Sequence, residues 1–217
     1  MGERKMVLRW TPLARVTHWL LFLGVTVGII TGLPVLDGRL RFLYTLVGGE
    51  TGREILHHYF TTVVLGIAVP LVIARGIETY RRGEESWWPG WADIRKGLVV
   101  AARWFKLTDR YPEIGFHHPL EKLLLISVHT GLLLLGLSGI PMALLNIGPE
   151  YRALLLLIHD IGFLMVAVPI VGHFMLAINP VNWETLRAMF THGKVSVEWA
   201  KHHHPGWKIE EAEEGQR

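Results

Sequence analysis

The sequence predicts an all-α membrane protein, organised as a single domain over residues 1–217 in a bundle of four transmembrane helices. Half of the 217 residues are hydrophobic and the mean hydropathy is +0.31, which is too apolar for an ordinary soluble domain. Four apolar stretches are each long enough to cross a hydrocarbon core, which takes about 20 helical residues. They are residues 16–36, 56–77, 120–145 and 153–178.

Basic residues predict the orientation of the chain. Eight arginines and lysines lie in residues 75–110, whereas the loops 37–55 and 146–152 carry three arginines and one arginine. Four more basic residues precede the first span: Arg4, Lys5, Arg9 and Arg15. Because basic loops stay in the cytoplasm, both termini and the loop after the second span are predicted to be cytoplasmic, in a bacterial inner or archaeal plasma membrane.

Two further segments complete the predicted architecture. In residues 91–107, aromatic and aliphatic residues recur at helical spacing among basic ones, which predicts a helix lying in the cytoplasmic interface. The tail, residues 179–217, is polar with an acidic end, and it either docks on the cytoplasmic face or extends from it. The net charge of +3 first indicates basic cytoplasmic loops in a membrane protein, so the predicted contact surface is lipid and not nucleic acid.

The chain has no cysteine and twelve histidines. The absence of cysteine excludes disulfides, thiolate zinc sites, iron-sulfur clusters and covalently attached haem within this chain. Histidine is therefore the strong metal ligand that remains. An ionisable side chain inside an apolar span is costly enough to indicate a functional site.

The fourth span carries two such histidines, His159 and His173. They are fourteen residues apart, so they leave the same helix face and lie about 21 Å apart along the axis. The alternating direction of the spans then places His18 at the depth of His173, near the cytoplasm, and His57 at the depth of His159, near the outer surface. Four histidines thus form two pairs at two depths.

Two bis-histidine haems b would use these pairs, because each iron takes one imidazole from each of two facing helices in a bundle core. The predicted axial ligands are His57 with His159 at the outer iron, and His18 with His173 at the inner iron. Zinc fits less well, since two histidines leave half of its coordination shell empty.

The first span adds possible haem contacts. Gly24, Gly28 and Gly32 recur every four residues, and this small-residue ridge favours close approach of a neighbouring helix or of a flat macrocycle. Gly28 and Gly32 are predicted to make room for the outer haem, with plain helix packing as the alternative. Arg15, one turn before His18, would bind a propionate of the inner haem or anchor the span at the interface.

Other polar residues in and near the spans have open roles. His58 points about 100° away from His57, so the two cannot serve one iron, and His57 is the preferred ligand. His129 has no partner at its depth, which favours a structural or proton-handling role. Asp160 would lie at the outer interface, and the roles of His202, His203 and His204 in the tail stay open.

Several motifs together resemble the gamma subunit, a cytochrome b, of membrane-bound respiratory formate dehydrogenase. The resemblance covers nearly the whole chain, and the segment GKVSVEWAKHHHPGW at 193–207 is its most specific part. The other matching motifs are Arg15 with His18 and Trp19, GREILHHYF at 52–60, LLIHDIGF at 156–163, and His173. This chain has one residue more than the family between the glycine-arginine pair and the first histidine of GREILHH.

The resemblance implies the same haem ligands and a respiratory role. Electrons would arrive from an iron-sulfur subunit on the outer side and pass through the outer and inner haems to menaquinone or ubiquinone, with protons taken from the cytoplasm. The quinone would bind near His118, Glu121 and His173, in a stretch where 118–122 departs from the family's asparagine, small residues and glutamine. Formate oxidation itself would need a molybdopterin or tungstopterin catalytic subunit, since no residue here performs it.

Two alternatives accompany this interpretation. The same histidine plan serves cytochrome b subunits of hydrogenases and of thiosulfate or polysulfide reductases. A protein of another class, a histidine-lined metal or proton transporter without haem, would also place histidines in spans, although it would be expected to carry intramembrane carboxylates.

Overall fold

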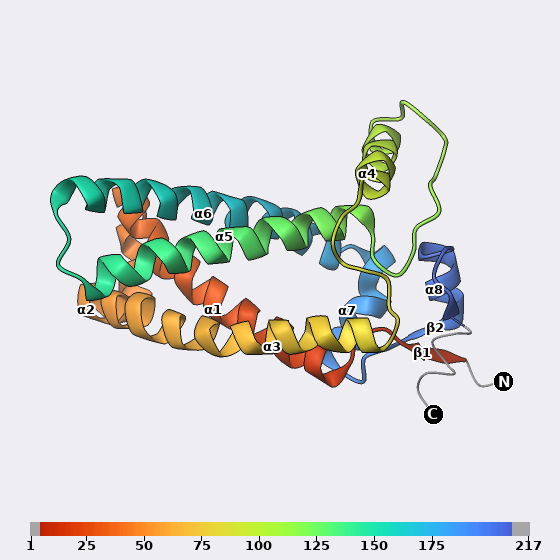
Figure 1. Cartoon of the computed structure of the whole chain (residues 1–217), viewed down its shortest axis with the longest axis horizontal. Coiled ribbons are helices and arrows are strands. Elements are labelled where there is room, and N and C mark those ends of the chain that lie inside the picture. Colours follow the sequence, from red (N-terminus) through yellow and green to blue (C-terminus); the bar gives the residue numbers. More distant parts are fainter. Residues whose placement is uncertain (1–4, 210–217) are drawn as a thin grey trace. The chain divides into compact units, whose positions relative to one another are not determined.

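The computed structural model describes residues 5–209, and most of them are helical (Figure 1). Arg4 and the acidic end of the tail, 210–217, lie outside the described residues. The helical elements are α1 (Pro12–Leu36), η1 (Gly38–Val47), α2 (Gly49–Glu54), η2 (Ile55–Phe60), α3 (Thr61–Arg81), α4 (Trp91–Trp104), α5 (Pro119–Leu144), α6 (Pro149–Ala177), η3 (Pro180–Asn182), α7 (Trp183–Phe190) and α8 (Val197–His203). The two strands are β1 (Met6–Leu8) and β2 (Lys194–Ser196).

Four helical segments are long and apolar enough to cross a membrane, which confirms the predicted spans. They are Pro12–Leu36, Gly49–Arg81, Pro119–Leu144 and Pro149–Ala177. Three of them begin with a proline, a residue whose fixed backbone angle suits the first helical position and whose missing N–H is not needed there. The second segment is continuous through α2, η2 and α3 and begins seven residues before the predicted span.

The contacts divide the chain into two compact units. The helical unit consists of Leu13–Arg75 and Thr130–Ala167, and the tail unit consists of Met1–Pro12, Gly76–His129 and Val168–Arg217. Helices α1, α3, α5 and α6 each pass from one unit into the other. The single domain expected from the sequence stays a prediction.

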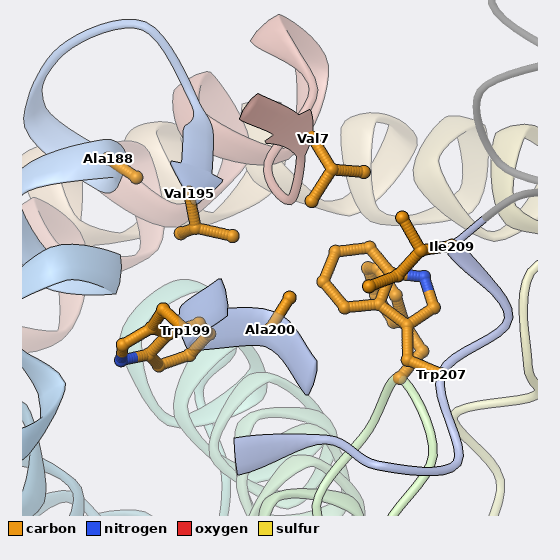
Figure 2. Packing of buried hydrophobic residues seen from close by; sticks show 8 residues of the cluster. Val7, Ala188, Val195, Trp199, Ala200, Trp207 and Ile209 are labelled. Carbon is orange, nitrogen blue, oxygen red and sulfur yellow. The ribbon is translucent and has the colours of Figure 1, made fainter. Parts of the chain in front are cut away.

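In the tail unit, β1 and β2 lie side by side as an antiparallel pair with Val7 opposite Val195 (Figure 1). Side chains from both strands, from α7 and α8, from the residues after α8 and from the residues before α5 form a hydrophobic core (Figure 2). Its members are Val7, Phe116, Ala188, Val195, Trp199, Ala200, Trp207 and Ile209. The tail is therefore folded through residue 209, although its polar composition left this open.

A buried arginine joins the N-terminal segment to the start of α5. Arg9 is 4% exposed, and its guanidinium donates to the Phe116 carbonyl and lies 3.6 Å from a Glu121 oxygen. The same guanidinium lies over the Phe116 ring, 4.3 Å from its centroid, and 5.4 Å from the Trp207 centroid. One side chain thus binds backbone, carboxylate and two aromatic rings.

The predicted interfacial helix is observed as α4, and a buried lysine holds it. Lys122, at the start of α5, donates to Glu85 at 2.7 Å and to Asp93 of α4 at 3.1 Å. On α4, Trp91 and Leu98 are exposed, whereas Val100 is buried. The helix is amphipathic as expected, and its position in the membrane interface stays a prediction.

Packing of the tail is expected to depend on pH through His204. This imidazole is 6% exposed and donates from Nδ1 to the Gly115 carbonyl at 2.7 Å. Burial, reinforced by the charge of Arg9, lowers the pKa of His204 to about 3, although the carbonyl bond and Glu121 oppose the shift. Because the unfolded chain binds this proton near pH 6.5, stability falls by about 1.4 kcal/mol per pH unit below 6.5.

Hydrogen exchange of residues 180–209 between pH 7.5 and 5 measures this loss. The variant His204→Asn keeps a donor for Gly115 but cannot titrate, so its exchange should depend less on pH. An equal pH response in both proteins would assign the effect to other groups, such as His118.

Candidate functional site

Two of the predicted ligands meet in the helical unit. The rings of His57, in η2, and His159, in α6, have centroids 6.2 Å apart with an interplanar angle of 55°. A metal–imidazole bond is about 2 Å long, and the ring centre lies about 1 Å beyond the bound nitrogen. Two imidazoles on opposite sides of one metal therefore have ring centres about 6 Å apart. The observed spacing therefore fits a shared metal between the two rings.

A π-helical turn presents His57. Residues Ile55–Phe60 form this turn, and the Thr61 backbone N–H donates five residues back, to the Leu56 carbonyl. A π-turn holds one residue more than an α-helical turn and is frequent at functional sites. His57 is thus presented by a turn with one residue more than a regular α-helical turn.

The partners of His57 come from α1. Its Nδ1 lies 2.8 Å from the hydroxyl of Thr31, a residue with no exposed surface. A Cβ built on Gly32 would lie 3.2 Å from Cε1 of His57, so α1 passes close to the ring. Gly32 therefore lies beside His57, and its contact with haem stays a prediction.

The partners of His159 repeat this arrangement from α5. Its Nδ1 lies 3.1 Å from the hydroxyl of Ser138, which is also fully buried. A Cβ built on Gly139 would lie 3.1 Å from Cε1 of His159. Each histidine therefore faces a hydroxyl residue and the glycine that follows it.

The other glycines of α1 pack against the second span. A Cβ on Gly24 would lie 2.8 Å from Leu65, and one on Gly28 would lie 3.3 Å from Thr61. These contacts are helix packing of the kind that small residues permit. A contact between Gly28 and haem stays a prediction.

The inner pair is divided between the two units. His18 lies in the helical unit and His173 in the tail unit, so their pairing stays a prediction. His18 packs edge-on against Trp19, with centroids 5.1 Å apart. Arg15 precedes it by one turn of α1, as the sequence indicates.

Two other histidines have clear surroundings. The ring of His58 lies 5.8 Å from that of His57 at an interplanar angle of 70°, so the two rings face different directions. In the tail unit, His129 donates from Nδ1 to the Leu125 carbonyl at 2.6 Å, and its ring lies 5.6 Å from Trp87. These contacts support a structural role for His129.

Two of the predicted quinone residues, His118 and Glu121, lie in a polar network at the start of α5, and His173 belongs to α6. One Glu121 oxygen is 3.2 Å from Nδ1 of His117, and the other accepts from the His118 backbone N–H at 3.2 Å. Nδ1 of His118 accepts from the backbone N–H of Leu120 at 3.2 Å. Burial lowers the pKa of His118, against the opposing charge of Glu121. At neutral pH this imidazole is uncharged and carries its proton on Nε2.

The donor set of the helical unit fits a haem iron, which needs only two imidazoles from the protein. Within residues 5–209, no group of three or more His, Asp or Glu side chains could hold a metal ion. His57 and His159 have the required spacing, and both are held by buried neighbours.

Sequence reasoning missed Thr31, Ser138 and Gly139. The signal that could have found them is a hydroxyl residue followed by glycine. This dipeptide occurs once in the first span, at 31–32, and twice in the third, at 130–131 and 138–139, and the two matched copies lie near the ends of their spans. Sequence reasoning also missed the burial of Arg9 and its contacts with Phe116, Glu121 and Trp207, because the sequence shows it only as one of several basic residues.

Comparison with known proteins identifies the family. A model of the family prokaryotic cytochrome b561 matches residues 9–192. The chain is 22% identical over 211 residues to the cytochrome b556(fdo) subunit of formate dehydrogenase from Escherichia coli K12, covering 95% of this chain and 94% of that protein. It is 23% identical over 221 residues to the cytochrome b556(Fdn) subunit of nitrate-inducible formate dehydrogenase from the same strain, covering 98% and 96%. The chain therefore belongs to the prokaryotic cytochrome b561 family and is a membrane cytochrome that binds haem b.

Proposed function

We propose that this chain is the cytochrome b subunit of a formate dehydrogenase-type respiratory complex and carries electrons through the membrane to quinone. The spacing of His57 and His159 is the observation that carries the proposal, because it fits two axial ligands of one iron. Similarity over nearly the full length to two formate dehydrogenase cytochrome b subunits supports the type of complex.

The proposed cofactors are two haems b, which supply one-electron transfer when bound. His57 and His159 would hold the outer haem, and Gly32 leaves space beside His57. His18 and His173 would hold the inner haem, with Arg15 near a propionate. Gly28 would contribute close packing at the outer level.

The proposed quinone pocket lies near His118, Glu121 and His173. A neutral His118 with its proton on Nε2 can donate a hydrogen bond to a quinone carbonyl. Glu121 is held by Arg9 and His117, so it can fix the His118 backbone and supply a buried negative charge beside the pocket. Menaquinone and ubiquinone both present the carbonyl that this donor requires.

The proposed partners are an iron-sulfur subunit on the outer side and a molybdopterin or tungstopterin catalytic subunit. Both termini and the segment with α4 would face the cytoplasm, in keeping with the basic residues at 75–110. Protons for quinone reduction would then come from the cytoplasmic side.

Purification of the complex from its native membrane tests this function. We expect about two haems b per chain by pyridine haemochrome, formate-dependent reduction of both, and reoxidation by added quinone. A complex reduced by hydrogen and not by formate would favour a hydrogenase cytochrome. A chain purified without haem would contradict the proposal.

A further inference from the structure

Two buried hydroxyls contact the outer histidines in the same way. Thr31 Oγ1 lies 2.8 Å from Nδ1 of His57, and Ser138 Oγ lies 3.1 Å from Nδ1 of His159. Both hydroxyl residues are fully buried, and both belong to the helical unit. Each belongs to the span that precedes its histidine in the chain.

The direction of each hydrogen bond follows from a second contact. Thr31 Oγ1 lies 2.6 Å from the Val27 carbonyl, and Ser138 Oγ lies 2.6 Å from the Leu134 carbonyl. A carbonyl only accepts, and a hydroxyl has one proton, so that proton is directed to the carbonyl. Toward the imidazole, each hydroxyl oxygen must then accept, and Nδ1 must be the protonated nitrogen. The lone pair is left on Nε2 of both rings.

The following glycines hold the same edge of each ring. Cε1 of His57 is 3.2 Å from a Cβ built on Gly32, and Cε1 of His159 is 3.1 Å from one built on Gly139. Any larger residue would press on the ring at an atom adjacent to Nδ1. His57 also hydrogen-bonds the backbone of Gly28, and His159 that of Leu135, which again requires a proton on the ring. Each ring edge is thus fixed by hydrogen bonds and by one close backbone approach.

We propose that Thr31-Gly32 and Ser138-Gly139 are matched positioning pairs that lock both axial imidazoles of the outer haem as Nδ1–H tautomers with Nε2 free for iron. The inference rests on the proposed ligation by His57 and His159. A hydrogen bond donated by Nδ1–H raises the basicity of the metal-bound nitrogen. More basic ligands favour ferric over ferrous iron, so the two hydroxyls lower the reduction potential of the outer haem.

Removal of each hydroxyl tests this role in the assembled protein. In Thr31→Val and Ser138→Ala, the midpoint potential of the outer haem should rise. The ferric form should lose threefold to tenfold in stability relative to the ferrous form, which raises the potential by about 30 to 60 mV for a one-electron couple. The low-spin ferric signal of the same haem should shift in electron paramagnetic resonance, because the ring is free to turn. The double variant should show a larger shift than either single variant.

Three controls separate the possible outcomes. Thr31→Ser restores the hydroxyl and should restore the potential. Thr45→Val removes another hydroxyl of the helical unit, which donates to the Phe42 carbonyl away from both histidines, and should leave the potential unchanged. The inner haem of each variant reports whether the chain still folds.

Unchanged potentials and resonance signals in Thr31→Val and Ser138→Ala would overturn the inference, provided that His57→Ala loses one haem. Retention of two haems by His57→Ala would instead contradict the proposed ligation, and the inference with it.

Discussion

Replacement of His57 by alanine is expected to lower the haem content from two per chain to one. The imidazoles of His57 and His159 are 6.2 Å apart, so loss of either would leave the proposed outer iron with a single protein ligand. Pyridine haemochrome per mole of chain measures the loss. The reduced-minus-oxidised spectrum should retain the band of the inner haem, which shows that the protein is still folded.

The neighbouring histidine provides a matched control. His58 is adjacent in the chain and its ring is 5.8 Å from that of His57, but it is turned by 70°. His58→Ala should keep both haems. Added imidazole should restore the second haem to His57→Gly by occupying the space of the missing ring. Loss of a haem from His58→Ala, with both retained by His57→Ala, would exchange their roles.

The four spans and the common depth of His57 and His159 could be predicted from the sequence because both depend on local properties. Length and apolar composition define a transmembrane helix. The depth of a histidine follows from its place along a span of known direction, and this alone places His57 and His159 at one level. The two rings lie 6.2 Å apart in the structure, and their role as ligands of one metal stays a prediction.

Contacts between distant segments could not be predicted in this way. The β1–β2 pair joins residues 6–8 to 194–196, and three-residue strands leave too short a pattern to recognise. The tail core depends on Trp199 and Trp207, whose burial requires Val7 and Phe116 from elsewhere in the chain. The contact between the Thr31 hydroxyl and His57 could not be predicted either, because a threonine within an apolar span usually hydrogen-bonds only its own helix.

Replacement of Arg9 by methionine is expected to destabilise the tail unit by about 3 kcal/mol, since removal of one member of a buried ion pair strands the other charge. Arg9 is the member with the smaller exposed fraction, 3% of its side chain against 27% for Glu121. Its loss also removes a hydrogen bond to Phe116 and contacts with two aromatic rings. The thermal unfolding midpoint and proteolysis within residues 180–209 measure the effect.

A second substitution, at Glu121, tests whether the loss of stability in Arg9→Met is electrostatic. In the double variant Arg9→Met with Glu121→Gln, the carboxylate that loses its arginine is neutralised, so much of the lost stability should return. Arg39→Met is the matched control, because its ion pair with Asp37 is exposed, with 89% of the arginine side chain accessible, and its removal should not move the midpoint. If the double variant is no more stable than Arg9→Met alone, the contribution of Arg9 is its packing against Phe116 and Trp207. The aromatic contacts would then stabilise the tail, and the charge of Glu121 would not require Arg9 for stability.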